Sequence, residues 1–358
     1  MAKSPSIRDV AQLAKVSIGT ASRALNNKSN VLPETRAQVL KAATELGYKL
    51  QFRVPTSVSS KLNTIGVVMK SDPGRHSRVD PFHYVILTGV EAECQKLGIS
   101  LMFSRIEVDE YSHAISTPPI LGDDSVDGLI IVGTVLSDPA IAASIPSDIP
   151  VALVDSYNPH REMDSVHIDN LGGAYKALNY ILSHGHRRIG LIASNGSVNE
   201  HPGVRVRREV YLQVLRENGI TDTYIQDSYL SPDSGYEATM ELMSKWPEVT
   251  AIFACNDLAA SGAISALNEM GLRVPEDVSI VGFDDTDHAS QTTPKLTTIF
   301  VDKFLMGTLG VRHLFDRAID LERVPIETQI HTRLIERESI ISLVDRPTRV
   351  NTLRAPDT

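Results

Sequence analysis

The stretch SIRDVAQLAKVSIGTASRALNNKSNVLPETRAQVLKAATELGY, residues 6–48, decides the fold of the N-terminal end of the chain. Apolar residues recur within it at helical spacing in three runs. Residues that favour the start of a helix stand at the head of each run, namely Ser6, Ser17 and Pro33. Gly47 is expected to end the third helix. The sequence therefore predicts three short helices.

The first two predicted helices are joined by a tight turn at residues 15–17. In the second helix, residues 18–25, the small apolar side chains can face inward, and the outward face carries Ile18, Gly19, Ser22 and Arg23. Such spacing is typical of a helix-turn-helix, whose second helix fits the major groove and presents its N-terminal residues to base edges.

The net charge of -9 hides a division along the chain. Residues 1–62 contain ten Lys and Arg against three Asp and Glu, a charge of +7, whereas the remainder contains 25 against 41, a charge of -16. A basic head on an acidic body indicates that only the head meets a polyanion. Two other interpretations stay open: a solvated basic face, and a small helical bundle without a nucleic-acid role.

Residues 6–48 resemble the headpiece of the lac/gal repressor family nearly end to end. The resemblance implies that Ile18, Gly19 and Arg23 occupy positions that read base edges. It implies phosphate-contacting or capping positions for Ser6, Ser17, Thr20, Ser22, Asn26 and Asn30. The guanidinium of Arg23 can donate two hydrogen bonds to O6 and N7 of a guanine. Gly19 has no side chain and can only let the backbone approach the groove.

The linker, residues 49–63, departs from that family. The family has a Pro-Asn step and then a hinge helix whose leucine wedge enters the minor groove. Alignment without gaps puts Leu50 at the proline position and Ser57 at the leucine position, with Pro55 inside the expected helix. We therefore expect residues 50–61 to be extended or disordered off DNA, with Val58 as an alternative, shifted wedge.

From Thr64 onward the chain alternates apolar strands with helices, which predicts parallel sheets covered on both faces. Polar residues at the carboxyl ends of such strands line a ligand crevice. Three acidic or amide groups stand there: Asp155, Asn256-Asp257 and Asp284-Asp285. Acids in that place can grip sugar hydroxyls, but each can instead cap a helix or brace a loop.

The body also resembles the lac/gal repressor family, in motifs such as DPFHYVILTGVEAECQKLGI, VDGLIIVG and FACNDLAASGAISALNEMGLRVPEDVSIVGFDD. The resemblance implies an α/β, periplasmic-binding-protein-like effector domain, residues 64–345. It implies two Rossmann-like subdomains joined by three crossovers. Their predicted ranges are 64–167 with 301–330, and 168–300 with 331–345.

By motif, the resemblance implies that the effector pocket is formed by Asp80, Phe82, Asp155, Arg207, Asn256, Phe283 and Asp284, and the strand-end rule adds Asp257. The phenyl rings can cover the apolar face of a sugar. The register around the basic run at 205–208 can shift, which makes Arg205 an alternative to Arg207. The family's frequent pocket aromatic aligns near Leu230, so one stacking platform is expected to be missing.

Other classes of protein receive little support. No run of about 18 apolar residues and no signal-peptide core is present, so we expect a cytoplasmic protein without a membrane partner. The His184-Gly185-His186 turn lacks further ligands at metal spacing, and no catalytic motif or cofactor motif occurs, so we expect no metal, no cofactor and no enzyme activity. Cys94 and Cys255 are expected to be reduced core thiols.

The sequence thus predicts a transcriptional repressor that binds operator DNA as a homodimer and responds to a small-molecule effector, a sugar. Whether the effector releases DNA or promotes binding is left open. The alternative is a transport-type sugar-binding protein that shares only the fold of the body with such a repressor. The tail, residues 346–358, has prolines and no leucine heptads, so we expect it to be disordered and to form no coiled coil.

Overall fold

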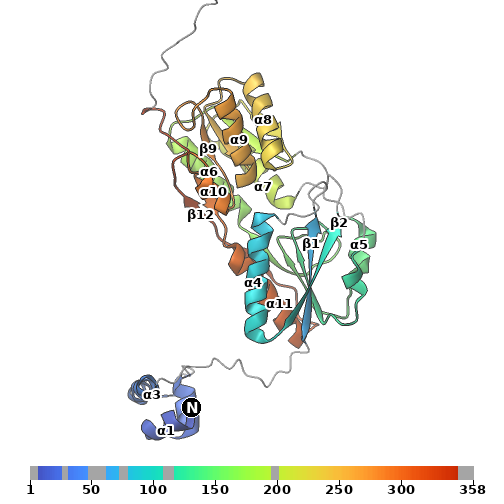
Figure 1. Ribbon diagram of the computed structural model, residues 1–358, viewed down its shortest axis with the longest axis vertical. Helices are drawn as coiled ribbons and strands as arrows, with labels where there is room; N and C mark the ends of the chain where they lie inside the picture. The colour runs from blue at the N-terminus through green and yellow to red at the C-terminus, as the bar shows by residue number, and fades with distance from the viewer. Residues whose placement is uncertain are drawn as a thin grey trace, which may run out of the picture. The chain divides into compact units, whose positions relative to one another are not determined.

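A computed structural model describes residues 7–25, 31–46, 62–71, 80–107, 117–194 and 201–345 (Figure 1). Its contacts separate Met1–Ser59 from Ser60–Thr358, so the head and the body are described one at a time. The predicted linker residues 50–61 and the tail 346–358 lie outside the described residues. The predicted division of the chain at residue 48 also falls outside them and stays a prediction.

The head has the three helices that the sequence predicts: α1 (Ile7–Leu13), α2 (Ile18–Leu25) and α3 (Pro33–Glu45). A small apolar core joins them, formed by Val10, Ala11, Ala14, Ala21, Ala24, Leu25, Val39, Ala42 and Ala43. Ser17 caps α2 as predicted, because the Thr20 amide donates to its Oγ at 3.0 Å. The turn before α2 places Lys15 at φ 49. Gly47, the predicted end of α3, is not among the described residues.

The first lobe of the body is built on a six-stranded sheet in the order β11-β5-β4-β3-β1-β2, in which every pair is parallel. Its strands are β1 (Thr64–Ser71), β2 (Ser100–Glu107), β3 (Gly128–Val132), β4 (Val151–Val154), β5 (Asp164–Ile168) and β11 (Glu327–Ile330). Alternate strand residues enter two separate apolar clusters, one with α4 (Pro81–Leu97) and α11 (Lys303–Ile319), the other with η1 (Pro119–Gly122) and α5 (Pro139–Ser144). Both faces of the sheet are therefore covered.

The second lobe has a four-stranded parallel sheet in the order β7-β6-β8-β9. The strands are β6 (Ile189–Ala193), β7 (Tyr224–Asp227), β8 (Ala251–Ala254) and β9 (Ser279–Val281). The helices are α6 (Asn170–Ser183), α7 (Pro202–Glu217), α8 (Pro232–Lys245), α9 (Asp257–Glu269) and α10 (Asp287–Gln291). An antiparallel pair, β10 (Thr298–Phe300) with β12 (Arg333–Ile335), completes the lobe.

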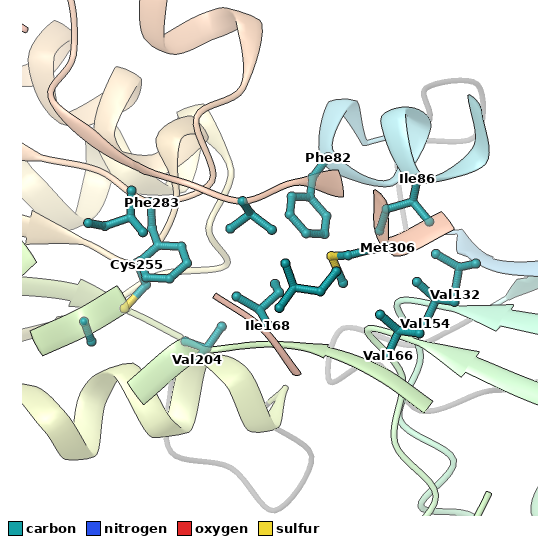
Figure 2. Close-up of a cluster of buried hydrophobic side chains, with 14 of the residues drawn as sticks. Phe82, Ile86, Val132, Val154, Val166, Ile168, Val204, Cys255, Phe283 and Met306 are labelled. Carbon is teal, nitrogen blue, oxygen red and sulfur yellow. The ribbon is translucent and has the colours of Figure 1, made fainter. Parts of the chain in front are cut away.

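The chain passes between the two lobes three times, after β5, after β10 and after β11. One apolar cluster continues from one lobe into the other, as Figure 2 shows. Phe82 and Met306 contribute to it from the first lobe, and Val204, Cys255 and Phe283 contribute from the second. The strand ends that carry the predicted site residues therefore meet around a shared core. Cys94 and Cys255 are both buried and neither is part of a disulfide, as predicted.

Several elements were not anticipated from the sequence. The strand β5 was missed because its sequence, DSVHI, places polar residues among apolar ones. Its buried Asp164 forms ion pairs with Arg317 and Arg323, which lie far along the chain. The helix α11 and the strands β10 to β12 follow the last predicted strand, where no glycine or proline marks the start of α11. The helix α8 and the strand β7 were also unassigned.

Candidate effector site and DNA-binding face

The second helix of the head exposes its N-terminal end. Ser17 and Gly19 are exposed, Thr20 is partly buried, and 48% of Ile18 is exposed, although it is a large apolar residue. On the opposite side of α2, Ala21, Ala24 and Leu25 enter the core of the head. Of Ser22 and Arg23 only the helical backbone is described, and Ser6, Asn26 and Asn30 lie outside the described residues. The described end of α2 offers a surface that the head does not itself cover.

Asp155 follows β4 directly, as predicted, and its carboxylate lies between two imidazoles. Its Oδ2 is 3.9 Å from Nε2 of His83 on α4 and 3.7 Å from Nε2 of His201 at the start of α7. Its Oδ1 is buried and has no hydrogen-bond partner. Burial alone would raise the pKa of Asp155, but His201, His83 and Arg207 together hold the pKa below its ordinary value. The site thus contains an ionised acceptor that protein donors leave partly unsatisfied.

Arg207 of α7 is held by several contacts within the site. Its Nε donates to Oδ1 of Asn170 at 2.9 Å, and one terminal nitrogen donates to the carbonyl of Cys255. The other terminal nitrogen is 3.7 Å from Oδ1 of Asp284. The guanidinium lies 3.6 Å above the ring centroid of Phe283. Phe283 is fully buried, so in this conformation one face of its ring supports Arg207.

The structure separates the two arginines between which the sequence left a choice. Arg207 is 6% exposed and reaches Asp284, whereas the Arg205 side chain is 56% exposed and forms only a 4.0 Å ion pair with Glu209, one turn along α7. Residues two positions apart in a helix lie on nearly opposite faces, because one turn takes about 3.6 residues. Arg205 therefore points away from the group formed by Arg207 and Asp284.

Asp284 comes three residues after the end of β9 at Val281 and has an unusual backbone, with φ 107. Burial raises its pKa well above the ordinary value, and Arg207 opposes that effect. A buried lysine, Lys303 at the start of α11, donates from Nζ to the carbonyls of Asp284, Asp285 and Val301. Burial lowers the pKa of Lys303. Lys303 fixes the strand-end turn that carries Asp284.

Three of the predicted residues already use their side chains locally. Asp80 caps α4, because its Oδ1 accepts from the Phe82 amide at 2.8 Å. Asn256 caps α9 through the Ala259 amide at 2.8 Å and donates to the carbonyl of Leu230 at 2.9 Å. Asp257 accepts from two threonines of neighbouring segments. These contacts match the capping and bracing roles that the sequence left open for such residues.

The sequence did not single out His83, His201, Asn170 or Lys303. None of them directly follows an apolar strand, so the strand-end rule passes over them. One local signal was available for His201, which stands directly before Pro202 at the start of α7. In the described part of the chain, no group of three or more His, Cys, Asp or Glu side chains is arranged to hold a metal ion.

An open groove of about 470 Å³ lies elsewhere on the second lobe, between α8 and α9. It is lined by residues such as Tyr236, Ser261 and Ile264, and it contains none of the predicted site residues. The convergent buried charges lie instead around Asp155 and Arg207. Charge and burial therefore favour the latter as the candidate site. No helix among the described residues is long and apolar enough to cross a membrane.

Comparison with known proteins gives two family matches. Residues 6–51 match the bacterial regulatory proteins of the lacI family, and residues 178–340 match the periplasmic binding protein-like domain. The HTH-type transcriptional repressor PurR of Pasteurella multocida (strain Pm70) is 31% identical over 347 residues, which are 94% of this chain and 98% of that protein.

Two solved structures cover nearly the whole chain. The transcriptional regulator CelR in complex with cellobiose is similar with a TM-score of 0.66 and 30% identity, over 94% of this chain and 99% of that one. The lac repressor dimer bound to operator and the anti-inducer ONPF is similar with a TM-score of 0.65 and 28% identity, over 95% of this chain and 100% of that one.

Proposed function

Because the chain belongs to the lacI family of bacterial regulatory proteins, we propose that it is a repressor whose affinity for operator DNA is controlled by a sugar. The observation that carries the effector half is the convergence of Asp155, Arg207 and Asp284. These three side chains come from both lobes and are each less than a tenth exposed, and Oδ1 of Asp155 has no protein donor.

The DNA half of the proposal rests on the head. Its basic charge attracts the phosphate backbone without sequence preference, and the exposed end of α2 supplies the groups for base edges. We assign base reading to Ile18, Gly19 and Arg23, and backbone contacts to Ser6, Ser17, Thr20, Ser22, Asn26 and Asn30. Two heads in a homodimer match a pseudo-palindromic operator, because two-fold protein symmetry presents two equivalent half-sites.

A neutral sugar fits the chemistry of the proposed site. Its hydroxyls can donate to the free Oδ1 of Asp155 and accept from Arg207, while Asp284, with its raised pKa, can donate or accept. Phe82 is 6% exposed beside these groups and can cover an apolar ring face. The similarity to a cellobiose-bound regulator supports the same class of effector. Repression of this kind takes place on the chromosome, in the cytoplasm, and needs no catalytic group.

The test is a mobility-shift assay with a DNA fragment from the chain's own promoter, at moderate salt, with D-ribose and cellobiose as trial effectors. We expect the wild-type protein to prefer this fragment over scrambled DNA and one of the sugars to change its affinity. Arg23→Ala should weaken specific binding by ~1–3 kcal/mol and leave non-specific binding nearly unchanged. Equal affinity of the wild type for both fragments would favour the alternative, a sugar-binding transport protein.

The same assay separates the two sites. Asp284→Ala should bind DNA like the wild type and lose its response to the sugar, because it removes one wall of the effector site. Asp222→Ala is the matched control, an exposed acid of the second lobe, and should keep the response. Sugar affinity left unchanged by Asp284→Ala, in calorimetry on the full chain, would contradict the assignment of the site. The direction of the wild-type response tells an inducer from a corepressor.

A further inference from the structure

His201 connects the two lobes at the proposed effector site. It is the residue before α7 of the second lobe, and its Nε2 lies 3.0 Å from the backbone carbonyl of Asp155, at the end of β4 in the first lobe. Its Nδ1 lies 3.3 Å from the amide of Gly203, which it caps. One imidazole therefore holds the start of α7 with one nitrogen and the opposite lobe with the other.

These two contacts define the protonation state of the ring. The Gly203 amide is a donor, so Nδ1 must accept and carry no proton. The Asp155 carbonyl is an acceptor, so Nε2 must carry the proton and donate. Only the neutral imidazole with its proton on Nε2 satisfies both partners. A second proton, on Nδ1, would face the N–H of Gly203 and place a cation at the N-terminus of a 16-residue helix, where the helix dipole disfavours it.

The charged and titratable groups around His201 come from several elements. The Asp155 carboxylate is 3.7 Å from Nε2, and the Tyr157 ring packs edge-on at 5.4 Å between centroids. Lys70 of β1 and Arg207 of α7 act on it as like charges. Farther out, His83 lies on the opposite side of Asp155, and His167 of β5 stacks on Tyr157 at 4.4 Å. Burial lowers the pKa of His201, although the Asp155 carboxylate opposes that effect.

We propose that His201 is a positioning residue for the effector, a neutral latch that donates across the lobes to Asp155 and holds the closed form of the site. The proposal rests on the proposed function, since the effector is the ligand that closure would enclose. The latch holds Asp155 in place through its backbone, which leaves Oδ1 for the effector. Closure thereby acquires a dependence on pH.

The direction of this dependence follows from linkage. When the lobes part, the ring enters water and regains its ordinary pKa of 6.5, whereas in the closed form its pKa is lower. The open form therefore binds more protons, so the latch is fully present above the ordinary pKa and is lost as the pH falls below it. Effector affinity should fall between pH 7.5 and pH 5.5 by at most about tenfold, the change in the neutral fraction of an imidazole of ordinary pKa, and by less in proportion to the share of sugar-free protein in which the latch is already closed.

Two variants separate the latch from the helix cap. His201→Asn keeps an acceptor where Nδ1 stands, and Asn is a good N-cap, but it is too short to reach the Asp155 carbonyl. His201→Gln places an amide N–H where Nε2 stands and does not titrate. Calorimetry on the full chain, with D-ribose or cellobiose, should give about fivefold weaker binding for His201→Asn at pH 7.5, the size of one neutral hydrogen bond. For His201→Gln it should give near wild-type affinity and a much flatter pH profile.

A second measurement needs no sugar. In histidine-labelled full-length protein, NMR should find the His201 ring, assigned by its loss in His201→Asn, as the Nε2–H tautomer with a pKa below 6.5. If neither sugar binds the wild type, the proposed sugar class is wrong, and the NMR result alone decides whether His201 forms the latch. A His201→Asn variant that binds and titrates like the wild type, or a ring with the Nδ1–H tautomer, would overturn the latch while leaving the proposed function intact.

Discussion

Asp257 shows what one buried carboxyl does for the second lobe. Its Oδ2 accepts from the Thr286 amide at 2.7 Å and from the Thr286 hydroxyl at 3.2 Å, and its Oδ1 accepts from the Thr298 hydroxyl at 2.5 Å. It therefore ties the start of α9 to the segments after β9 and at β10. Burial raises its pKa to about 6, against the opposing effect of the threonine hydrogen bonds and Lys303.

A raised pKa makes the stability contribution of Asp257 depend on pH. The folded state holds the proton more tightly than the unfolded chain, so the contribution is full below the ordinary pKa of 3.8 and is lost as the pH rises through about 6. Asp257→Asn cannot lose a proton. Relative to wild type, this variant should therefore gain about 1–3 kcal/mol of unfolding free energy between pH 4 and pH 7.5, measured by urea denaturation. A constant difference between the two proteins across that range would contradict the assignment.

The same residues explain how far the sequence predicted the site. Asp155, Asp257 and Asp284 share one signal, an acid after an apolar strand, although only Asp155 directly follows its strand, while Asp257 begins α9 and Asp284 comes three residues after β9. The rule could not distinguish Asp257 from Asp155. The carboxylate of Asp257 accepts hydrogen bonds from Thr286 and Thr298, whereas Oδ1 of Asp155 has no donor. That difference depends on side chains that only the fold brings together. Lys303 and His201 were missed for the same reason.

At the scale of helices, two pairs pack closely through reciprocal glycines. In the first lobe, a Cβ on Gly89 of α4 would lie 2.1 Å from the Phe304 carbonyl, and one on Gly307 of α11 would lie 2.0 Å from the Ile86 carbonyl. In the second lobe, Gly235 of α8 and Gly262 of α9 face backbone atoms in the same way, at 2.4 Å and 2.0 Å. Each lobe therefore uses a helix pair whose backbones come too near each other for any side chain. The local pattern predicted α4 and α9 but not α8 and α11, and the close approach between these distant segments has no local signal.

This packing predicts a steric penalty. Gly307→Ala should lower the unfolding free energy of the body by about 1–3 kcal/mol, although alanine favours helix, because the new methyl group meets rigid backbone rather than a movable side chain. Gly122→Ala is the matched control, since a Cβ there meets nothing within 4 Å. It should change stability by less than about 1 kcal/mol. Urea denaturation followed by circular dichroism measures both variants, and equal effects would mean that the helices part at little cost.

At the scale of the molecule, the charge of the chain divides close to the boundary between its two compact units. The first 62 residues carry +7 and the rest carries -16, and the two compact units meet near that boundary, at Ser59. Phosphate contacts release condensed counterions, so the salt dependence of DNA binding reports the charges that touch the backbone. The net negative charge of the body repels DNA at long range, which should keep the body's contribution to non-specific affinity low. The division therefore predicts that the salt slope belongs to the head.

The prediction can be tested by removing equal charge from each part of the full-length chain. Arg8 and Lys15 are exposed in the head, and Arg161 and Arg216 are exposed in the body. The double variant Arg8→Gln with Lys15→Gln should make the slope of log K against log salt shallower by up to about 3.6 for a dimer, at about 0.9 for each of the four phosphates that would no longer meet a cation. Arg161→Gln with Arg216→Gln should leave the slope unchanged, because those side chains would touch no phosphate. Both variants change the net charge of the molecule by the same amount. Equal shifts in slope would therefore mean that DNA responds to total charge, and only a shift confined to the head variant assigns the phosphate-binding cations to the head.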